Sequence, residues 1–447
     1  MAGIYIHIPF CKSRCIYCGF YSTTALDLRQ RYVDALCREM EIRGEKPEVR
    51  GEKLEVRGEK LEVRGERIDL SAEKIDTIYL GGGTPSQLTI EQLQQIFDAI
   101  IHPYIYNKVY PLTSPPSPLT SNFSSLTPEI TIEVNPDDVT VEFAAVLQQL
   151  PVTRVSMGIQ TFNDQRLRFL HRRHTARQAI EAVSILRSAG IRNLSIDLMY
   201  GFPGETLADW QSDISAALAL NVEHISAYCL MIEEGTPLHK MFTGYGLQVT
   251  DDYPDEQHTG DCPLCEQRSE LQGDCPQCVD EELERQMYYT LIDLLTAAGY
   301  EHYEISNFAR PGFRSRHNSS YWNGTPYIGL GAAAHSYNIR SRSWNVSDIH
   351  AYIEGIERGE RIFEEELLDD DTRYNDAITV GLRTCEGINL DALSKKYRDY
   401  CMKNARRYLD DGLLELSVVG DSNSPTLHLT RRGLFVSDMV MSDLMMV

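Results

Sequence analysis

The 447-residue sequence lacks any apolar run of roughly 18 residues, and this excludes an ordinary membrane-spanning helix. Basic residues are scarce, since 43 Lys and Arg stand against 65 Asp and Glu for a formal net charge of -22. Such a chain repels nucleic-acid phosphates, so we expect no nucleic-acid partner. The opening segment MAGIYIHIPF has neither a charged leader nor a long apolar stretch. We therefore expect no signal peptide and a cytoplasmic location.

Eleven cysteines are present, and most of them fall into two close groups. In a reducing compartment, grouped cysteines are more typical of metal ligands than of disulfides. The first group is Cys11, Cys15 and Cys18, and the second is Cys262, Cys265, Cys275 and Cys278. Four cysteines stand alone and are interpreted as packing residues: Cys37, Cys229, Cys385 and Cys401.

Three segments are interpreted as insertions into a larger fold. Residues 43–67 contain the repeat GEKPEVR, GEKLEVR, GEKLEVR, whose apolar positions do not follow coiled-coil spacing, so we expect a solvated tract. Residues 109–128 are rich in Pro, Ser and Thr and are expected to form a disordered loop. Residues 251–280 carry the second cysteine group.

Without the insertions, six strand-like runs alternate with helix-like stretches, which predicts an α/β fold with a parallel sheet or barrel. The expected strands are GIYIHIPF, KIDTIYLGGG, EITIEVNP, TRVSMGIQ, RNLSIDLMYG and EHISAYCLMI. Beyond about residue 330 the pattern changes to helices with one hairpin, typical of a winged-helix-like unit with a structural, covering role. We divide the chain into a core, 1–310, and a C-terminal domain, 311–447.

Polar residues and glycines recur where the predicted parallel strands end, which is where such folds bind ligands. These strand ends carry Cys11, the Gly81–Gly83 run, Glu133, Gln160 and Asp197. The cysteines of the first group have the spacing C-x3-C-x2-C on one loop. Three thiolates on a four-iron cluster leave one iron open to a further ligand, whereas closed sites use four protein ligands.

This cysteine pattern resembles the radical S-adenosylmethionine (SAM) superfamily. The resemblance implies a partial (β/α)6 barrel of TIM type, with a 4Fe-4S cluster whose open iron binds SAM and cleaves it to a 5'-deoxyadenosyl radical. Backbone at the glycine run can approach SAM, carboxylates can accept its hydrogen bonds, and Gln160 and Arg172 can donate. The expected SAM residues are Tyr5, Tyr17, Gly19, Gly82, Gly83, Thr84, Glu133, Gln160, Arg172 and Asp197.

The order of the motifs IYIHIPFC, GGGTPS, IEVNP, GIQTFND, DLMYGFPGET and HNSSYW resembles the anaerobic coproporphyrinogen III oxidase-like family. That family contains an oxygen-independent oxidase, which decarboxylates two propionates, and a heme chaperone. The oxidase pattern has a fourth cysteine where this chain has Phe20, and a long stretch before the triad where this chain has ten residues. We therefore favour a heme chaperone that passes heme to an acceptor protein. The oxidase, with its place in porphyrin biosynthesis, and another radical reaction stay open as alternatives.

The resemblance further implies that HNSSYW, residues 317–322, binds heme through His317, Asn318, Tyr321 and Trp322. An imidazole can ligate heme iron and an indole can stack on a porphyrin, while the nearby Arg310, Arg314 and Arg316 suit propionates. His335 is an alternative iron ligand. The sequence names no acceptor, and any peripheral membrane contact would be made through it.

The second cysteine group consists of two C-P-x-C turns, Cys262-Pro-Leu-Cys265 and Cys275-Pro-Gln-Cys278. Paired turns of this kind bring four thiolates together tetrahedrally. They predict a structural zinc site, with iron as the alternative metal.

Overall fold

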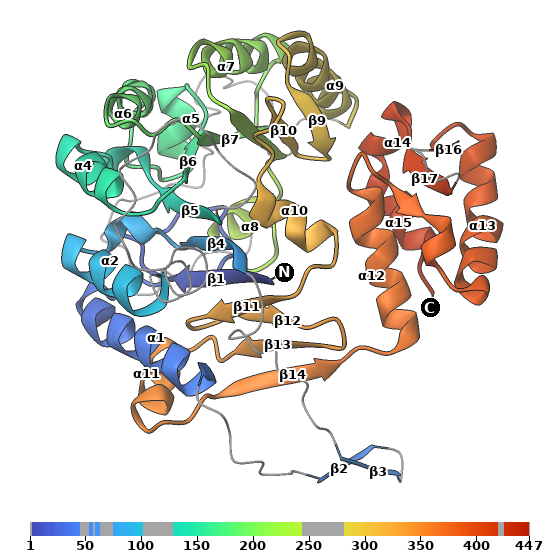
Figure 1. Ribbon diagram of the computed structural model, residues 1–447. Coiled ribbons are helices and arrows are strands. Elements are labelled where there is room, and N and C mark those ends of the chain that lie inside the picture. Colours follow the sequence, from blue (N-terminus) through green and yellow to red (C-terminus); the bar gives the residue numbers. More distant parts are fainter. Residues whose placement is uncertain are drawn as a thin grey trace, which may run out of the picture.

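Six parallel strands form the centre of the protein, and they follow one another in the sheet in the order of the sequence (Figure 1). The computed structural model describes residues 2–44, 53–56, 59–62, 75–101, 128–243, 281–418 and 424–446. The six strands are β1 (Ala2–Ile8), β4 (Ile75–Gly82), β5 (Glu129–Val134), β6 (Arg154–Gln160), β7 (Leu194–Tyr200) and β8 (His224–Cys229). They correspond to the six predicted runs, so the expected α/β architecture is confirmed.

Helices follow these strands, and most of them cover the outer side of the curved sheet (Figure 1). The helices are α1 (Arg29–Gly44), α2 (Ile90–Ile96), α4 (Val141–Gln149), α5 (Asp164–Phe169), α6 (Ala176–Ser188), α7 (Leu207–Ala219), α8 (Pro237–Thr243) and α9 (Glu281–Ala297). Helices α5 and α8 contribute instead to a small hydrophobic cluster beside the cysteine loop. Thr89, Thr175 and Thr206 begin α2, α6 and α7 as capping boxes, which satisfy backbone N–H groups at the helix starts. One large hydrophobic cluster fills the space between the sheet and the outer helices.

The sheet continues on both sides of the six strands and stays open, so it forms an arc of a barrel. On one side, β1 pairs in parallel with β11 (Tyr327–Leu330), and antiparallel strands follow: β12 (His335–Tyr337), β13 (Ser341–Asn345) and β14 (Phe363–Leu367). On the other side, β8 pairs antiparallel with β10 (Asn307–Ala309), which pairs with β9 (Glu301–Glu304). Helix α11 (Ile349–Glu357) packs on α1.

The strands β12 to β14 differ from the helical pattern expected beyond residue 330. They are three to five residues long, and β14 reads FEEEL, in which three consecutive glutamates have high helix propensity. Pairing overrides this propensity because Arg342 on β13 lies opposite Glu366. Long-range strand pairing of this kind has no local sequence signal.

The remaining C-terminal residues form a separate helical unit around a second hydrophobic cluster. It lies beside the core near α10 (Arg316–Trp322) in Figure 1. Its elements are α12 (Asp370–Leu382), β15 (Ile388–Asn389), α13 (Lys395–Asp410), β16 (Leu414–Val418), β17 (Pro425–Leu429), α14 (Arg431–Phe435) and α15 (Ser437–Leu444). Helices with one small antiparallel sheet agree with the expected winged-helix-like unit. The domain boundary at 310 stays a prediction, and we note that the large sheet includes strands up to Leu367.

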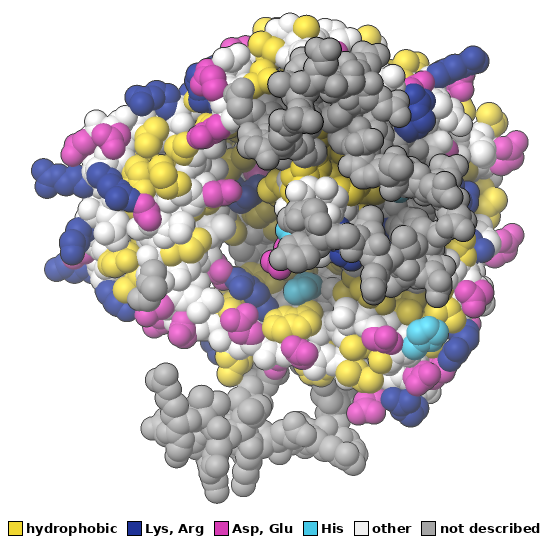
Figure 2. Space-filling view, turned by 180° about the vertical axis from the view of Figure 1, so that it is seen from behind, with side chains coloured by type: hydrophobic (Ala, Val, Ile, Leu, Met, Phe, Trp, Pro, Cys, Tyr) yellow, Lys and Arg dark blue, Asp and Glu magenta, His cyan; other side chains and the backbone are white. Residues whose placement is uncertain are grey.

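Within the repeat segment, β2 (Lys53–Val56) and β3 (Glu59–Glu62) pair only with each other, as a two-stranded sheet. The Pro, Ser and Thr-rich insertion lies outside the described residues, except for Pro128. Among the helices that are described, none is long and apolar enough to span a membrane. Figure 2 shows that the opposite face of the molecule is hollowed near its centre, with hydrophobic side chains on part of the rim.

Candidate functional site

The cysteine loop begins directly after β1, and the glycine run after β4 holds its first residues in place. Gly83 donates its backbone N–H to Ile8 O at 2.9 Å, and Thr84 donates to Phe10 O at 2.9 Å. A Cβ added at Gly83 would lie 2.6 Å from the Pro9 carbonyl carbon. Only glycine permits this approach, so the run serves first to seat the chain's own cysteine loop.

A polar network joins two of the three cysteines through neighbouring strand ends. The Cys11 thiol lies 3.7 Å from the Thr84 hydroxyl, which accepts a hydrogen bond of 3.1 Å from the Asn135 amide. Arg172 donates to Asn135 Oδ1 at 2.9 Å and to Cys15 Sγ at 3.5 Å. The described residues contain no group of His, Cys, Asp and Glu close enough to hold a single metal ion. A four-iron cluster instead takes each thiolate on a different iron.

Glu133, at the end of β5, is anchored by both of its oxygens. Tyr79 donates to Oε1 at 2.6 Å, and the backbone N–H of Gly82 donates to Oε2 at 3.1 Å. Burial raises the pKa of Glu133, while these hydrogen bonds act in the opposite direction. Gly82 has φ +106, and a Cβ there would meet the His7 ring at 2.6 Å. The glycine is therefore required both by its backbone conformation and by His7.

Asp197 and Gln160 occupy the next strand ends. Burial, followed by the charge of Glu133, raises the pKa of Asp197 to about 7. Gln160 has φ +71, which is rare for a residue with a side chain, and β6 shifts its register at this point. Such a conformation costs about 1–3 kcal/mol and marks functional sites more often than ordinary strands. The structure thus brings both residues to the same end of the sheet as Glu133.

Tyr5, Tyr17 and Gly19 complete the expected SAM set. The Tyr5 ring stacks on Tyr79 with centroids 6.2 Å apart. Tyr17 packs against a small hydrophobic cluster that includes Leu238 of α8. A Cβ at Gly19 would collide with the side chain of Glu233, which therefore lies over the cysteine loop.

Burial, the largest influence, raises the pKa of the Cys11 thiol, while Thr84 and the charge of Arg172 lower it. The pKa of Cys18 rises to about 11 for the same reason of burial.

The HNSSYW motif forms α10, and its histidine is enclosed. His317 is 1% exposed, with Nδ1 2.8 Å from the Thr77 hydroxyl and Nε2 2.8 Å from the Tyr321 hydroxyl. Its ring stacks on Tyr79 with centroids 5.0 Å apart. Burial lowers the pKa of His317 to about 3, so the ring is neutral. Ligation of iron by either nitrogen would require one of these hydrogen bonds to break, and heme binding by this motif stays a prediction.

Trp322 faces the C-terminal unit. The Arg383 guanidinium lies over its ring at 4.9 Å and also donates to the buried Glu304 carboxylate at 2.8 Å. The Trp322 Nε1 atom is buried without a hydrogen-bond partner among the described residues. Asn318 donates its backbone N–H to Ser315, which caps α10. The motif therefore connects the core to α12.

The three arginines expected to pair with propionates have partners within the chain. Arg310 donates to Asn221 and lies over the Tyr300 ring. Arg314 forms ion pairs with Glu301 and Glu386, and Arg316 lies 4.0 Å from Asp76. His335 is exposed and stacks on Trp344. The structure does not gather these groups around His317.

Two residues at this site, Tyr79 and Asn135, were missed from the sequence. Both lie in motifs already recognised, YLGGG and IEVNP, Tyr79 two positions before Gly81 and Asn135 two positions after Glu133. For Asn135, which directly follows β5, the strand end was the available signal, whereas Tyr79 lies within β4. Cys262, Cys265, Cys275 and Cys278 lie outside the described residues, so the zinc site stays a prediction.

The fold and the cysteine loop define a radical SAM protein, and residues 5–217 match the model of the Radical SAM superfamily. The solved structure of coproporphyrinogen III oxidase (HemN) from Escherichia coli has the same fold, with a TM-score of 0.71 at 18% identity. That similarity covers 99% of this chain and 89% of the other.

Curated relatives narrow the family further. The heme chaperone HemW of Bacillus subtilis is 30% identical, covering 89% of this chain and 87% of the relative. HemW of Mycobacterium tuberculosis is 30% identical, covering 99% of this chain and 94% of the relative. HemW of Lactococcus lactis is 29% identical, covering 88% of this chain and 84% of the relative. The chain belongs to the HemW family of radical SAM proteins.

Proposed function

We propose that this protein binds heme and transfers it to an acceptor protein, with a 4Fe-4S cluster and exchangeable SAM held in the core. The similarity to HemW heme chaperones over nearly the full length of both chains carries the proposal. Phe20 supports the proposal as well, because the oxidase pattern has a cysteine at this position. The Phe20 side chain is 74% exposed. The oxidase is the alternative, since HemN has the same fold.

The residues at the strand ends fit the proposed cofactors. Cys11, Cys15 and Cys18 would hold the cluster, and Arg172 orients the loop through Cys15. The buried carboxylates of Glu133 and Asp197 suit the positive charges of SAM. When bound, a reduced cluster supplies the electron that cleaves the sulfonium of SAM. Gln160 and Thr84 are further members of the proposed SAM set.

Heme titration of the anaerobically reconstituted protein, followed by its Soret absorbance, tests the proposal. We expect saturable one-to-one binding, followed by loss of heme to an apo-globin used as a probe acceptor. The Cys18→Ser variant, which removes one cluster ligand, separates heme binding from cluster assembly. Absence of specific heme binding, together with conversion of coproporphyrinogen III to a divinyl product, would contradict the proposal and favour the oxidase.

A further inference from the structure

A row of four polar side chains crosses the sheet from the SAM candidate Asp197 to the edge strand β9. In the strand pairing, Asp197 on β7 lies opposite Ser226 on β8, and Ser226 lies opposite Asn307 on β10. Asn307 in turn lies opposite Glu304 on β9. Side chains of paired residues point to the same face of a sheet, so these four residues form one line, here called the polar row. Ser226, Asn307 and Glu304 are 3%, 4% and 2% exposed.

Hydrogen bonds follow the polar row along its whole length. The Ser226 hydroxyl, which is hydrogen-bonded to Asp197, donates to Asn307 Oδ1 at 2.7 Å. Asn307 Nδ2 donates to Glu304 Oε2. Arg383 pairs with the other oxygen of Glu304 at 2.8 Å. The polar row therefore joins the SAM candidate Asp197 to an arginine of the C-terminal unit.

Arg383 ends helix α12 and lies where the C-terminal unit contacts the core. Its carbonyl accepts a hydrogen bond of 3.0 Å from the backbone N–H of Ile305, and Cys385 donates to Tyr303 O at 3.1 Å. The Arg383 guanidinium also lies over the Trp322 ring at 4.9 Å. A change at the end of the polar row thus acts directly on the contact between β9 and α12.

The Ser226 hydroxyl has one proton and more than one acceptor. Its proton points to Asn307 Oδ1, because the amide nitrogen of Asn307 is used by Glu304. The Ser226 oxygen can then accept a hydrogen bond from Tyr228 or from a protonated Asp197. An ionised Asp197 can only accept, so it competes with Asn307 for the Ser226 proton. The polar row therefore has two arrangements, which differ in the charge on Asp197.

A cation beside Asp197 favours the ionised form, with the proton released to solvent, and SAM has a cationic sulfur. When the Ser226 hydroxyl turns to Asp197, Asn307 Oδ1 loses its donor. Hydrogen bonds in a chain polarise and strengthen one another, so the bond from Asn307 to Glu304 weakens as well. A buried carboxylate with a weaker donor is less well stabilised, and the contact between Glu304 and Arg383 becomes easier to break.

We propose that the polar row couples SAM binding at Asp197 to the contact between the core and the C-terminal unit, with Ser226 and Asn307 as the positioning residues. The inference rests on the proposed function, because it takes Asp197 as part of the SAM site. It assigns a role to the segment EISN, residues 304–307. Bound SAM loosens the contact of Glu304 with Arg383, and by reciprocity a loosened contact strengthens SAM binding.

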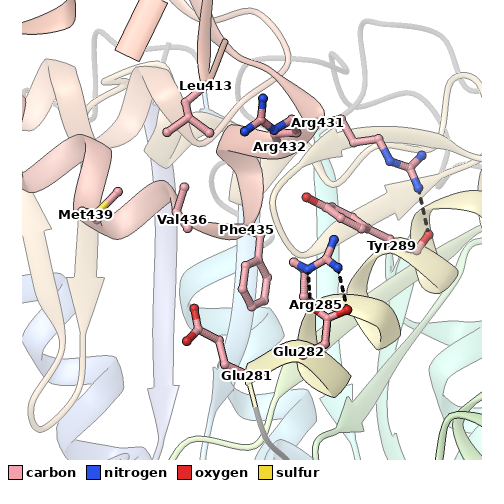
Figure 3. Close-up of a pocket in the computed structure, with 10 residues that line it drawn as sticks. All are labelled: Glu281, Glu282, Arg285, Tyr289, Leu413, Arg431, Arg432, Phe435, Val436 and Met439. Carbon is pink, nitrogen blue, oxygen red and sulfur yellow. Dashed lines mark hydrogen bonds and ion pairs between the residues drawn. The ribbon is translucent and has the colours of Figure 1, made fainter. Parts of the chain in front are cut away.

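A second contact between the two parts of the chain does not involve the polar row. Arg431 on α14 pairs with Asp293 on α9 at 2.6 Å, and its guanidinium lies over the Tyr289 ring at 4.9 Å. This contact borders a groove of about 830 Å³ that no member of the polar row lines (Figure 3). Like Arg383, Arg431 belongs to the C-terminal unit and pairs with a carboxylate of the core. It therefore provides a matched control.

The first experiment measures hydrogen exchange in α12 of the anaerobically reconstituted protein, without reductant, in the absence of SAM and at saturating SAM. We expect SAM to accelerate this exchange about fivefold in the wild type and to leave it unchanged in Ser226→Ala. Ser195→Ala should respond like the wild type, since Ser195 is similarly buried on β7 but is hydrogen-bonded to His224. Equilibrium dialysis with SAM establishes saturation of each protein.

The second experiment compares the affinity for SAM of Arg383→Gln and Arg431→Gln by the same dialysis, and it does not depend on the Ser226 variant. Neither arginine belongs to the proposed SAM set. Reciprocity predicts that Arg383→Gln binds SAM about fivefold more tightly than the wild type, whereas Arg431→Gln stays within about twofold. Loosening of the C-terminal unit by itself would change both affinities alike.

An affinity in Arg383→Gln that does not exceed that of Arg431→Gln would overturn the coupling. So would an effect of SAM on α12 that persists in Ser226→Ala or is absent from the wild type. These outcomes leave the proposed function intact, whereas a wild type that binds no SAM would overturn the proposed function itself.

Discussion

His317 and Thr77 form a hydrogen bond of 2.8 Å between α10 and β4, although 240 positions separate them in the sequence. The bond uses Nδ1, and Tyr321 occupies Nε2. The helix that carries HNSSYW is thereby joined to the strand that ends in the glycine run. This contact gives the motif a structural role that can be tested separately from heme.

Thr77→Val keeps the size of the side chain and removes this hydrogen bond. We expect the free energy of unfolding to fall by about 1–3 kcal/mol, because Nδ1 of His317 is then buried without a partner. Denaturant unfolding followed by circular dichroism measures the change. Thr24→Val, at an exposed position, should stay within about 0.5 kcal/mol of the wild type. Equal midpoints for both variants would argue against this role.

The pH dependence of stability should also depend on His317. Burial lowers its pKa to about 3, below the ordinary value of about 6.5, so the unfolded chain binds the proton more readily. The stability contributed by the neutral ring is present above pH ~6.5 and is lost as the pH falls toward 3. In His317→Asn the slope below pH ~6 should be shallower by up to about 1.4 kcal/mol per pH unit. Unfolding midpoints between pH 7.5 and 4.5 provide the measurement, and parallel curves would contradict the expectation.

Arg172 should be required for stable cluster assembly, because it links Cys15 to Asn135. Arg172→Gln should lower the iron and sulfide bound after anaerobic reconstitution several-fold. The neighbouring exposed Arg168 provides the matched Arg168→Gln control, which should bind iron normally. Normal iron content in both proteins would show that the cysteine loop orders without this arginine.

Binding of SAM should strengthen as Asp197 ionises. Burial and the charge of Glu133 raise its pKa to about 7, so the carboxylate is largely protonated at pH 6 and ionised at pH 8. Because SAM is cationic at sulfur, its affinity should rise across this interval, by at most about tenfold per pH unit. Asp197→Asn should bind weakly at every pH. Anaerobic equilibrium dialysis measures the affinity for SAM at each pH. A wild-type affinity that does not change with pH would exclude Asp197 from the SAM site.

The ion pair between Arg383 and Glu304 should hold the C-terminal unit on the core. The Glu304 side chain is 1% exposed and the Arg383 side chain is 26% exposed. Arg383 Nη2 lies 2.8 Å from Glu304 Oε1. Arg383→Gln leaves the buried Glu304 carboxylate without its cation. We expect the free energy of unfolding to fall by about 2–4 kcal/mol, which is less than for a fully buried pair because Arg383 is partly exposed to solvent. Hydrogen exchange in α12 should accelerate. The double variant with Glu304→Gln should recover part of the loss, whereas additive losses would show that the two residues act independently.

The central strands and the cysteine loop were accessible from the sequence because their signals are local. Each of the six strands is a short apolar run, and Cys11, Cys15 and Cys18 lie within eight consecutive residues. The SAM candidates at the strand ends follow from the same pattern, since parallel strands bring their ends to one edge. Tyr79 and Asn135 were missed because a strand pattern does not reveal which residues near its end contact the site.

The sequence by itself determined the parallel core, the triad and the family, because apolar runs and close ligand spacing are properties of neighbouring residues. Tertiary structure alone decided the pairing of β11 to β14 and the enclosure of His317 by Thr77 and Tyr321. Those features depend on contacts between residues far apart in the chain. Burial, which removes the His317 ring from solvent, arises only when such distant segments pack together.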